Sequence, residues 1–346
     1  MRVLARKLAR RSLRSFSSSS SVETIGAFAR AALRAANADS IAVTAADSSE
    51  SSALALSWTY GELLDRVDAF ARTLRDLGYT ESSAPLGVRG RNGGEVLVAY
   101  LGTAAAATRA RSAKTSDDLR AVFGGGRTRG TFVPFEDAEA AGAIVGAHEP
   151  IAFDGGSLRD AVILAEAARA AYRRRGDEDD AAVEEYSKCD DAMFYFAGSE
   201  RPTTGMTLVT HARRAGEALG MSSEDATCVP VPLGHAMGFG FGALATLARG
   251  GRVVLPSTVG SAGDGARARD AMCQAALDAI ESEACTLVVA DSHLAEAAAA
   301  AKTPTTRLRG GFIKVGSGDA IGACEPVSFW DTQLLTVGTP KKPRSL

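Results

Sequence analysis

Hydrophobic residues recur along this chain with two different periods, which together predict alternating helices and strands. From Leu63 to Leu77, apolar residues return every three or four positions, and Gly78 follows them. This period is typical of an amphipathic helix, and a glycine at this place is typical of a helix C-terminus. Helices that alternate with buried strands predict an α/β fold with mostly parallel sheets. Short apolar runs without the helical period predict strands near Leu86, Met193, Val253 and Leu287.

Weaker patterns complete the order of elements. An alanine-rich helix and a short strand are predicted within residues 24–47, a second apolar helix at Glu95–Leu101, and a further helix at Ser112–Phe123. The glycine-rich and basic stretch Gly124–Gly130 predicts a flexible loop, because no helix signal follows it, and a phosphate-binding role is the alternative. Residues 172–180, YRRRGDEDD, contain a run of arginines followed by a run of acidic residues, and this pattern predicts a solvated linker.

The composition is typical of a globular protein. The chain has 346 residues, of which 46% are hydrophobic and 23% charged, and its formal net charge is −2. A nearly balanced charge gives no general attraction to nucleic acid. No apolar stretch approaches the roughly 18 residues that indicate a transmembrane helix. The length is enough for a large core and favours two or more domains.

The five cysteines and four histidines are too scattered to indicate a disulfide framework or a structural zinc site. No two cysteines have the C-x-x-C spacing. The thiols are therefore expected to be reduced and mostly buried. Asp291, Ser292 and His293 have the residue types of a hydrolytic triad, but three consecutive residues cannot converge on one point.

The first 22 residues differ in composition from the rest of the chain. They contain six basic residues, and the first acidic residue is Glu23. Apolar residues can share one helix face with arginines on the other, and a serine run follows. This composition, rich in arginine and serine and free of acidic residues, is typical of a mitochondrial transit peptide. A secretory signal is disfavoured, because the arginines interrupt the apolar segment that it needs. We expect residues 1–22 to direct a mature chain, residues 23–346, to the mitochondrial matrix. A plastid and a disordered basic tail are the alternatives.

The stretch Phe194–His211, FYFAGSERPTTGMTLVTH, has the residue types of an anion-binding loop. A strand-like run ends at Ala197, and glycines and hydroxyls follow before a second apolar run. Glycines let the backbone approach a ligand, while N–H groups and hydroxyls donate to phosphate oxygens. The spacing of a Walker A loop is absent. An ordinary strand–turn–strand is the alternative.

This stretch resembles the signature loop of the acyl-adenylate-forming, AMP-binding synthetase superfamily. That loop reads [Y/F]-T-S-G-T-T-G-x-P-K-G and is followed by an apolar run. Residues 196–199 fill the first four places after Tyr195, and Gly205 matches the last glycine. Glu200 stands where the family has a threonine, and Thr204 stands where it has the lysine that meets phosphate charge.

Further segments resemble the same family and occur in its order. Thr59–Leu63 matches a T-Y-x-E-L start, and Asn92 opens an N-x-x-E match before an apolar helix. The runs LRGGF, PVS and TVGTP resemble the mitochondrial medium-chain acyl-CoA synthetase branch. Later matches are Cys228–Gly242, Gly250–Pro256, Leu308–Ser317 and Ile321–Phe329.

The resemblance implies a reaction and assigns roles to residues. A medium-chain fatty acid would react with ATP to form an acyl-adenylate, and CoA would then displace AMP, with Mg²⁺ as cofactor. The partners would be these small molecules, without nucleic acid. Glu325 would be catalytic and would bind the metal, while His235 and Gly238 would help to form the acyl pocket. The residues implied in nucleotide binding are Gly198, Ser199, Thr203, Thr204, Gly205, Gly316, Ser317, Gly322 and Cys324.

Two parts of the family's machinery have no counterpart in the sequence. These are the T-G-D segment that holds ribose and the small C-terminal domain with its catalytic lysine. We therefore expect an incomplete N-terminal domain, and three interpretations stay open. The chain is a ligase with a truncated or mis-spliced sequence, or a short protein that binds nucleotide, acyl groups or a partner subunit without catalysis. The third interpretation, an unrelated α/β protein, does not explain why the matches occur in family order.

Overall fold

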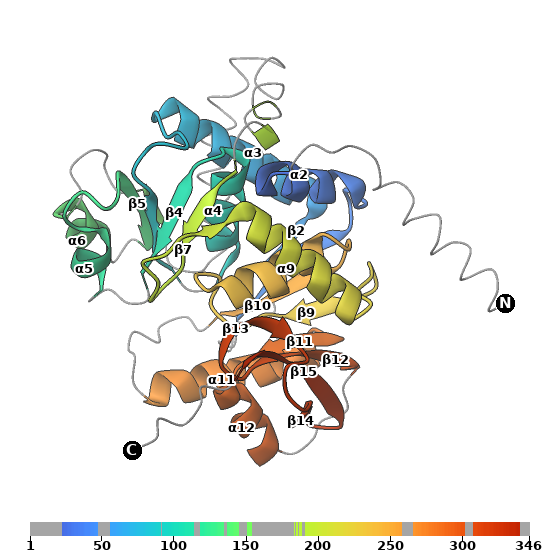
Figure 1. Ribbon diagram of the computed structural model, residues 1–346. Helices are drawn as coiled ribbons and strands as arrows, with labels where there is room; N and C mark the ends of the chain where they lie inside the picture. Colours follow the sequence, from blue (N-terminus) through green and yellow to red (C-terminus); the bar gives the residue numbers. More distant parts are fainter. Residues whose placement is uncertain are drawn as a thin grey trace.

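Two β-sheets carry the fold, with helices between them and on their outer faces (Figure 1). The expected transit peptide, residues 1–22, and the expected charged linker, residues 172–180, lie outside the described part of the chain. This computed structural model describes residues 23–47, 56–90, 92–113, 118–134, 137–144, 151–153, 183, 185, 187–188, 191–257, 266–301 and 307–339.

The larger sheet contains nine strands among the described residues. Its order is β13-β15-β12-β11-β9-β10-β1-β2, and β14 pairs with β15. The strands from β15 to β1 run parallel, while β2, β13 and β14 are antiparallel to their neighbours. The strands are β1, Ile41–Asp47; β2, Leu56–Thr59; β9, Ala226–Cys228; β10, Arg252–Ser257; β11, Leu287–Ala290; β12, Gly310–Lys314; β13, Ser317–Ile321; β14, Val327–Phe329; and β15, Thr332–Thr339.

The smaller sheet contains six strands in the described ranges, in the order β6-β5-β3-β4-β7-β8. All neighbours are parallel except β7 and β8, which form an antiparallel pair. The two sheets confirm the predicted α/β class with mostly parallel strands. The strands are β3, Leu86–Val88; β4, Arg109–Ser112; β5, Gly130–Pro134; β6, Ile151–Phe153; β7, Met193–Tyr195; and β8, Thr203–Thr204.

A layer of helices packs between the two sheets. Apolar residues of both sheets belong to one buried cluster, including Phe194 of β7 and Val253 of β10. Every residue of α4 is buried, so this helix lies at the centre of the core. The helices of this layer are α2, Ile25–Ala35; α3, Tyr60–Asp76; α4, Gly94–Ala105; α9, Gly205–Ala218; the π-helix η3, Met237–Leu244; and α10, Ala245–Leu247.

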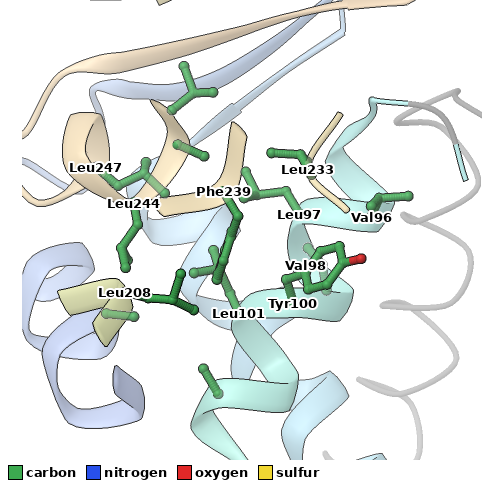
Figure 2. Close-up of a cluster of buried hydrophobic side chains, with 14 of the residues drawn as sticks. Val96, Leu97, Val98, Tyr100, Leu101, Leu208, Leu233, Phe239, Leu244 and Leu247 are labelled. Carbon is green, nitrogen blue, oxygen red and sulfur yellow. The ribbon is translucent and has the colours of Figure 1, made fainter. Parts of the chain in front are cut away.

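Figure 2 shows the core where α4 meets α9 and the segment after β9. Leu97 and Leu101 of α4 lie beside Phe239 of η3, and Leu208 of α9 points toward the same place. Each of these four side chains is almost fully buried. Burying an aliphatic or aromatic side chain stabilises a fold by about 1.5–3 kcal/mol, so this junction is a main source of stability.

Other helices cover the outer faces of the sheets. A second buried cluster joins α11, Ala266–Ser282, and α12, Ser292–Ala300, to the nine-stranded sheet. A third, smaller cluster contains residues of α5, Leu119–Phe123, and α6, Ala138–Gly142, and packs on the six-stranded sheet. None of the described helices combines the length and apolar character needed to cross a bilayer.

Local sequence signals explain the ends of α3. The Thr59 hydroxyl accepts from the backbone N–H of Glu62, and the Glu62 side chain accepts from the N–H of Thr59. This reciprocal pair satisfies two N–H groups that a helix start leaves without partners. Gly78 has φ +76°, a left-handed conformation that glycine adopts without strain. The predicted helix and its glycine terminus are confirmed.

The helix predicted at Ser112–Phe123 is wrong in its first part. Strand β4 ends at Ser112, and α5 begins only at Leu119. Residues of β4 pair with both β3 and β7, so backbone hydrogen bonds of the sheet outweigh the local helical pattern.

Candidate functional site

The glycine-containing loop lies at the carboxyl end of β7. The chain reverses direction after this strand, as the antiparallel pairing of Thr203 with Phe194 and of Thr204 with Met193 shows. The N–H of Ala197 donates to the carbonyl of Gly234 at 3.0 Å, which fixes the loop against the segment after β9. Ligands of α/β proteins bind at the carboxyl ends of parallel strands, so the fold places the loop where a ligand site is expected.

The second apolar run of this stretch forms helix α9. The carboxylate of Asp191 accepts from the N–H of Met206 at 2.7 Å and from the N–H of Ile25 at 3.2 Å. One carboxylate therefore caps the starts of two helices, α9 and α2. Gly205 is needed here, because a Cβ atom would lie 2.2 Å from Asp191 Oδ1 and 2.3 Å from Ile25 Cγ2. The strand–turn–strand alternative is incomplete, since the short strand β8 leads into a helix.

The hydroxyl groups of the loop make hydrogen bonds within the loop and its helix. Ser199 Oγ donates to the carbonyl of Arg201 at 2.9 Å and accepts from its N–H at 3.2 Å. Thr204 Oγ1 accepts from the N–H of Thr207 at 3.2 Å and so caps α9. Gly198 has φ +80°, which allows the tight turn. Ser199, Thr204 and Gly205 thus shape the loop, and their predicted role in nucleotide binding stays a prediction.

Three charged side chains meet beside the loop. Arg111 of β4 donates from Nη1 to Glu200 at 3.2 Å, and Arg127 does so at 3.4 Å to the other carboxylate oxygen. The guanidinium of Arg111 also lies over the ring of Tyr195, 4.3 Å from its centroid. Sequence analysis missed Arg111, although a charged residue in a buried strand is a signal that could have indicated it.

The histidine segment after β9 is held by Asn92. The side-chain amide donates to the carbonyls of Val229 and Val231 at 2.8 and 3.0 Å and accepts from the N–H of Leu233 at 2.8 Å. His235 lies two residues before η3, and its Nδ1 accepts from the N–H of Met237, the first residue of η3, at 3.2 Å.

Gly238 has a packing role in the same segment. A Cβ atom there would lie 2.4 Å from the carbonyl oxygen of Pro232 and 2.5 Å from that of Val231. The glycine therefore lets η3 pack directly on the backbone before it. The predicted roles of Gly238 and His235 in an acyl pocket stay predictions.

A histidine of α9 links the loop's helix to β13. His211 Nε2 lies 2.8 Å from Asp319 Oδ2, and its ring packs on Phe241 with centroids 4.8 Å apart. Burial lowers the pKa of His211, and the positive charges of Arg214 and Lys314 lower it further, while Asp319 opposes this shift. The hydrogen bond from His211 lowers the pKa of Asp319. At neutral pH the imidazole is therefore neutral and donates to a carboxylate.

The C-terminal group of predicted site residues lies around β13 and β15. Gly322 has φ +69°, and the backbone of Cys324 exchanges two hydrogen bonds with the Thr336 hydroxyl at 3.0 and 2.8 Å. Gly316 directly precedes β13, and Ser317 is the first residue of this strand. Glu325 is exposed. In the described part of the chain no hydrogen bond or ion pair joins this group to the loop after β7, so the site roles of this group stay predictions.

The acidic and thiol groups of the described residues form no cluster of three that could hold a metal ion. Nucleotide-bound Mg²⁺ takes one or two carboxylates and completes its shell with phosphate and water oxygens. Glu325 is exposed and carries the donor type that Mg²⁺ prefers, so it fits as one such ligand.

A pocket of about 60 Å³ lies away from the loop, beside α11 and α12. Asp291 and His293 line it together with Arg269 and Cys273. Asp291 Oδ1 accepts from the N–H of Leu294 at 2.9 Å, so this carboxylate caps α12. The structure thus gives Asp291 a helix-capping role.

The sequence matches no protein-family model and no curated protein, but its structure resembles solved ones. The crystal structure of VinN aligns with TM-score 0.59 and 16% identity over 85% of this chain and 68% of VinN. The inhibitor-bound N-terminal domain of FACL13 from Mycobacterium tuberculosis gives 0.60 and 14%, over 86% and 70%. A benzoate CoA ligase from Burkholderia xenovorans LB400 gives 0.60 and 18%, over 89% of this chain and 60% of the ligase. The likeness at these identities is one of fold, and this chain has the α/β fold that these structures share.

Proposed function

We propose that this protein activates a carboxylic acid with ATP and transfers the acyl group to CoA. The carboxylate would attack the α-phosphate and release pyrophosphate, and the thiol of CoA would then displace AMP from the acyl-adenylate. The observation that carries this proposal is the loop Gly198–Gly205 at the carboxyl end of β7. Its position in a fold shared with a benzoate CoA ligase and with FACL13 supports the same use.

A medium-chain fatty acid is the proposed substrate. The family resemblance of LRGGF and TVGTP motivates this choice, and η3 supplies an entirely buried apolar segment after His235. Gly238 and His235 would line the acyl side. Mg²⁺ would neutralise phosphate charge when bound, and Glu325 would contribute one ligand.

Binding without catalysis is the second candidate function. Thr204 stands in place of the loop lysine and caps α9, while Glu200 adds a negative charge beside the loop. Both features weaken the attraction of an anionic nucleotide. They support a protein that binds nucleotide or acyl groups but does not turn them over.

Exchange of labelled pyrophosphate into ATP tests the first function against the second. Purified protein with ATP, Mg²⁺ and octanoate is expected to catalyse exchange, and mass spectrometry should detect octanoyl-adenylate. Reactions without acid, and with benzoate in its place, control for hydrolysis and for chain preference. ATP binding without exchange would favour the second function. A protein that binds neither ATP nor the acid would contradict both proposed functions.

We also propose that the protein resides in the mitochondrial matrix. The basic, acid-free composition of residues 1–22 supports this location, and a plastid is the alternative. Fusion of residues 1–22 to a fluorescent protein should direct it to mitochondria. Replacing the six basic residues of that segment with glutamine should abolish import.

A further inference from the structure

We propose that Arg111 and Arg127 supply the positive charge for polyphosphate at the loop after β7, and that Glu200 is an internal counter-ion which a phosphate displaces. This inference deepens the proposed function and rests on it for the identity of the ligand. It assigns to two arginines of this chain the task that the missing loop lysine leaves open.

The geometry of the three charges suits a phosphate group. The two carboxylate oxygens of Glu200 face different arginines, at 3.2 Å from Arg111 Nη1 and 3.4 Å from Arg127 Nη1. Guanidinium groups bind phosphate oxygens with the same donors and at similar distances. A phosphate group that replaces the carboxylate can therefore present one oxygen to each arginine.

The loop itself supplies only one positive charge. Residues 196–205 contain one basic side chain, Arg201, and no lysine. The hydroxyls of Ser199 and Thr204 are engaged in bonds within the loop and at the start of α9. Positive charge beyond that of Arg201 must then come from elements next to the loop, and β4 provides Arg111 beside Tyr195.

Arg111 and Glu200 differ in how firmly they are held. The Arg111 side chain is only 11% exposed and packs on the Tyr195 ring, and its Nε has no hydrogen-bond partner among the described residues. The Glu200 side chain is 76% exposed. Glu200 can turn into solvent at little cost, whereas Arg111 stays in place. A buried guanidinium with an unused donor and a displaceable counter-ion is a site prepared for a stronger anion.

Isothermal titration with inorganic pyrophosphate, and separately with ATP, tests the proposal. Glu200→Gln keeps the shape of the side chain and removes the competing charge, so pyrophosphate should bind about tenfold more tightly, equivalent to ~1.4 kcal/mol. Arg111→Gln should weaken binding by about tenfold, and in the double variant the gain from Glu200→Gln should disappear. Glu224→Gln, an exposed carboxylate after α9, is the matched control and should bind as the wild type does.

Two further variants keep the test decisive. Arg127→Gln changes a half-exposed side chain and should weaken pyrophosphate binding without affecting the fold. If Arg111→Gln does not fold, Arg111→Lys retains the charge but loses the planar fork, and it should bind more weakly than the wild type.

Unchanged affinity in Glu200→Gln would overturn the proposal, as would wild-type affinity in both Arg111→Gln and Arg127→Gln. Absence of pyrophosphate binding in every variant would also overturn it. The proposed ligase activity is judged separately, by the exchange assay. If variants of these three residues exchange pyrophosphate as the wild type does, the proposed ligase activity is supported and this inference is contradicted. If Glu200→Gln binds pyrophosphate more tightly but the protein shows no exchange, the inference is supported and the proposed ligase activity is contradicted.

Discussion

At the scale of single residues, side chains outside the loop decide its shape and charge. Asp191 precedes β7 and holds the N–H of Met206, while Arg111 comes from the neighbouring strand β4. Neither residue belongs to the stretch whose sequence indicates the site. Arg111 and Glu200 are 89 positions apart in the chain, and such a pair leaves no periodic signal in the sequence. The loop itself could be predicted from its glycines and hydroxyls, but its electrostatics could not.

Gly205→Ala should destabilise the protein by about 3 kcal/mol, because the new methyl group would overlap both Asp191 and Ile25. Gly216→Ala on the same helix is the matched control. The three atoms nearest to its Cβ would all belong to the side chain of Arg249, which can move, and alanine favours a helix over glycine by up to about 1 kcal/mol. Urea unfolding followed by circular dichroism measures both. Equal effects of the two substitutions would contradict this account of Gly205.

At the scale of elements, segments with strong local signals could be predicted and those set by distant contacts could not. The α3 helix carries its own capping box, and its bounds follow from the sequence. The π-helix η3 could not be predicted, because its run of glycine and phenylalanine is apolar on every side and has no helical period. The structure instead positions it through Gly238 and through the bonds of Asn92 to the preceding segment.

Asn92→Ala should lower the free energy of unfolding by about 2–3 kcal/mol. Three hydrogen bonds are lost, and the carbonyls of Val229 and Val231 and the N–H of Leu233 lose their side-chain partner. Urea denaturation measures the change. Asn37→Ala, which removes one exposed bond to the N–H of Asp39, is the control and should cost well under 1 kcal/mol. A loss for Asn92→Ala no larger than that of the control would show that the segment holds its place without Asn92.

The contact between α9 and β13 should make stability depend on pH. Because the pKa of His211 is lowered in the folded state, the unfolded chain binds more protons between that pKa and about 6.5. The free energy of unfolding should therefore fall as pH drops through this window. The lowered pKa of Asp319 adds a loss only at more acidic pH, below its unfolded value of about 3.9.

His211→Gln should flatten the pH dependence between pH 7.5 and 5.5, values chosen to bracket the ordinary histidine pKa of about 6.5. Urea midpoints at the two pH values give the comparison. His293→Gln alters an exposed histidine of α12 and should leave the wild-type slope in place. A slope that persists in His211→Gln would assign the effect to other groups.

At the scale of the whole molecule, one core joins both sheets. The buried cluster that contains α4 includes residues of β3, β7, β10 and β11. The sequence could predict the α/β class and the position of many strands, since apolar runs and helical periods are local properties. The order of the strands within each sheet could not be predicted from the sequence, because parallel pairing depends on contacts between distant segments.

Leu101→Ala, at the centre of α4, should destabilise the protein by about 3–5 kcal/mol. Because α4 packs between the sheets, both should lose protection together. Hydrogen exchange followed by mass spectrometry should show equal increases in peptides from β4 and from β10. Faster exchange confined to one sheet would mean that the two sheets unfold as separate units.

The parallel pairing of β1 with β10 joins Val43 to Val253. During synthesis on the ribosome, β1 leaves the exit tunnel long before its partner has been translated. The six-stranded sheet, whose strands all lie between these two positions, can form first. The antiparallel pair of β1 and β2 must wait for β10, with one edge open to other nascent chains. Vectorial translation therefore favours a folding order in which the smaller sheet precedes the larger one.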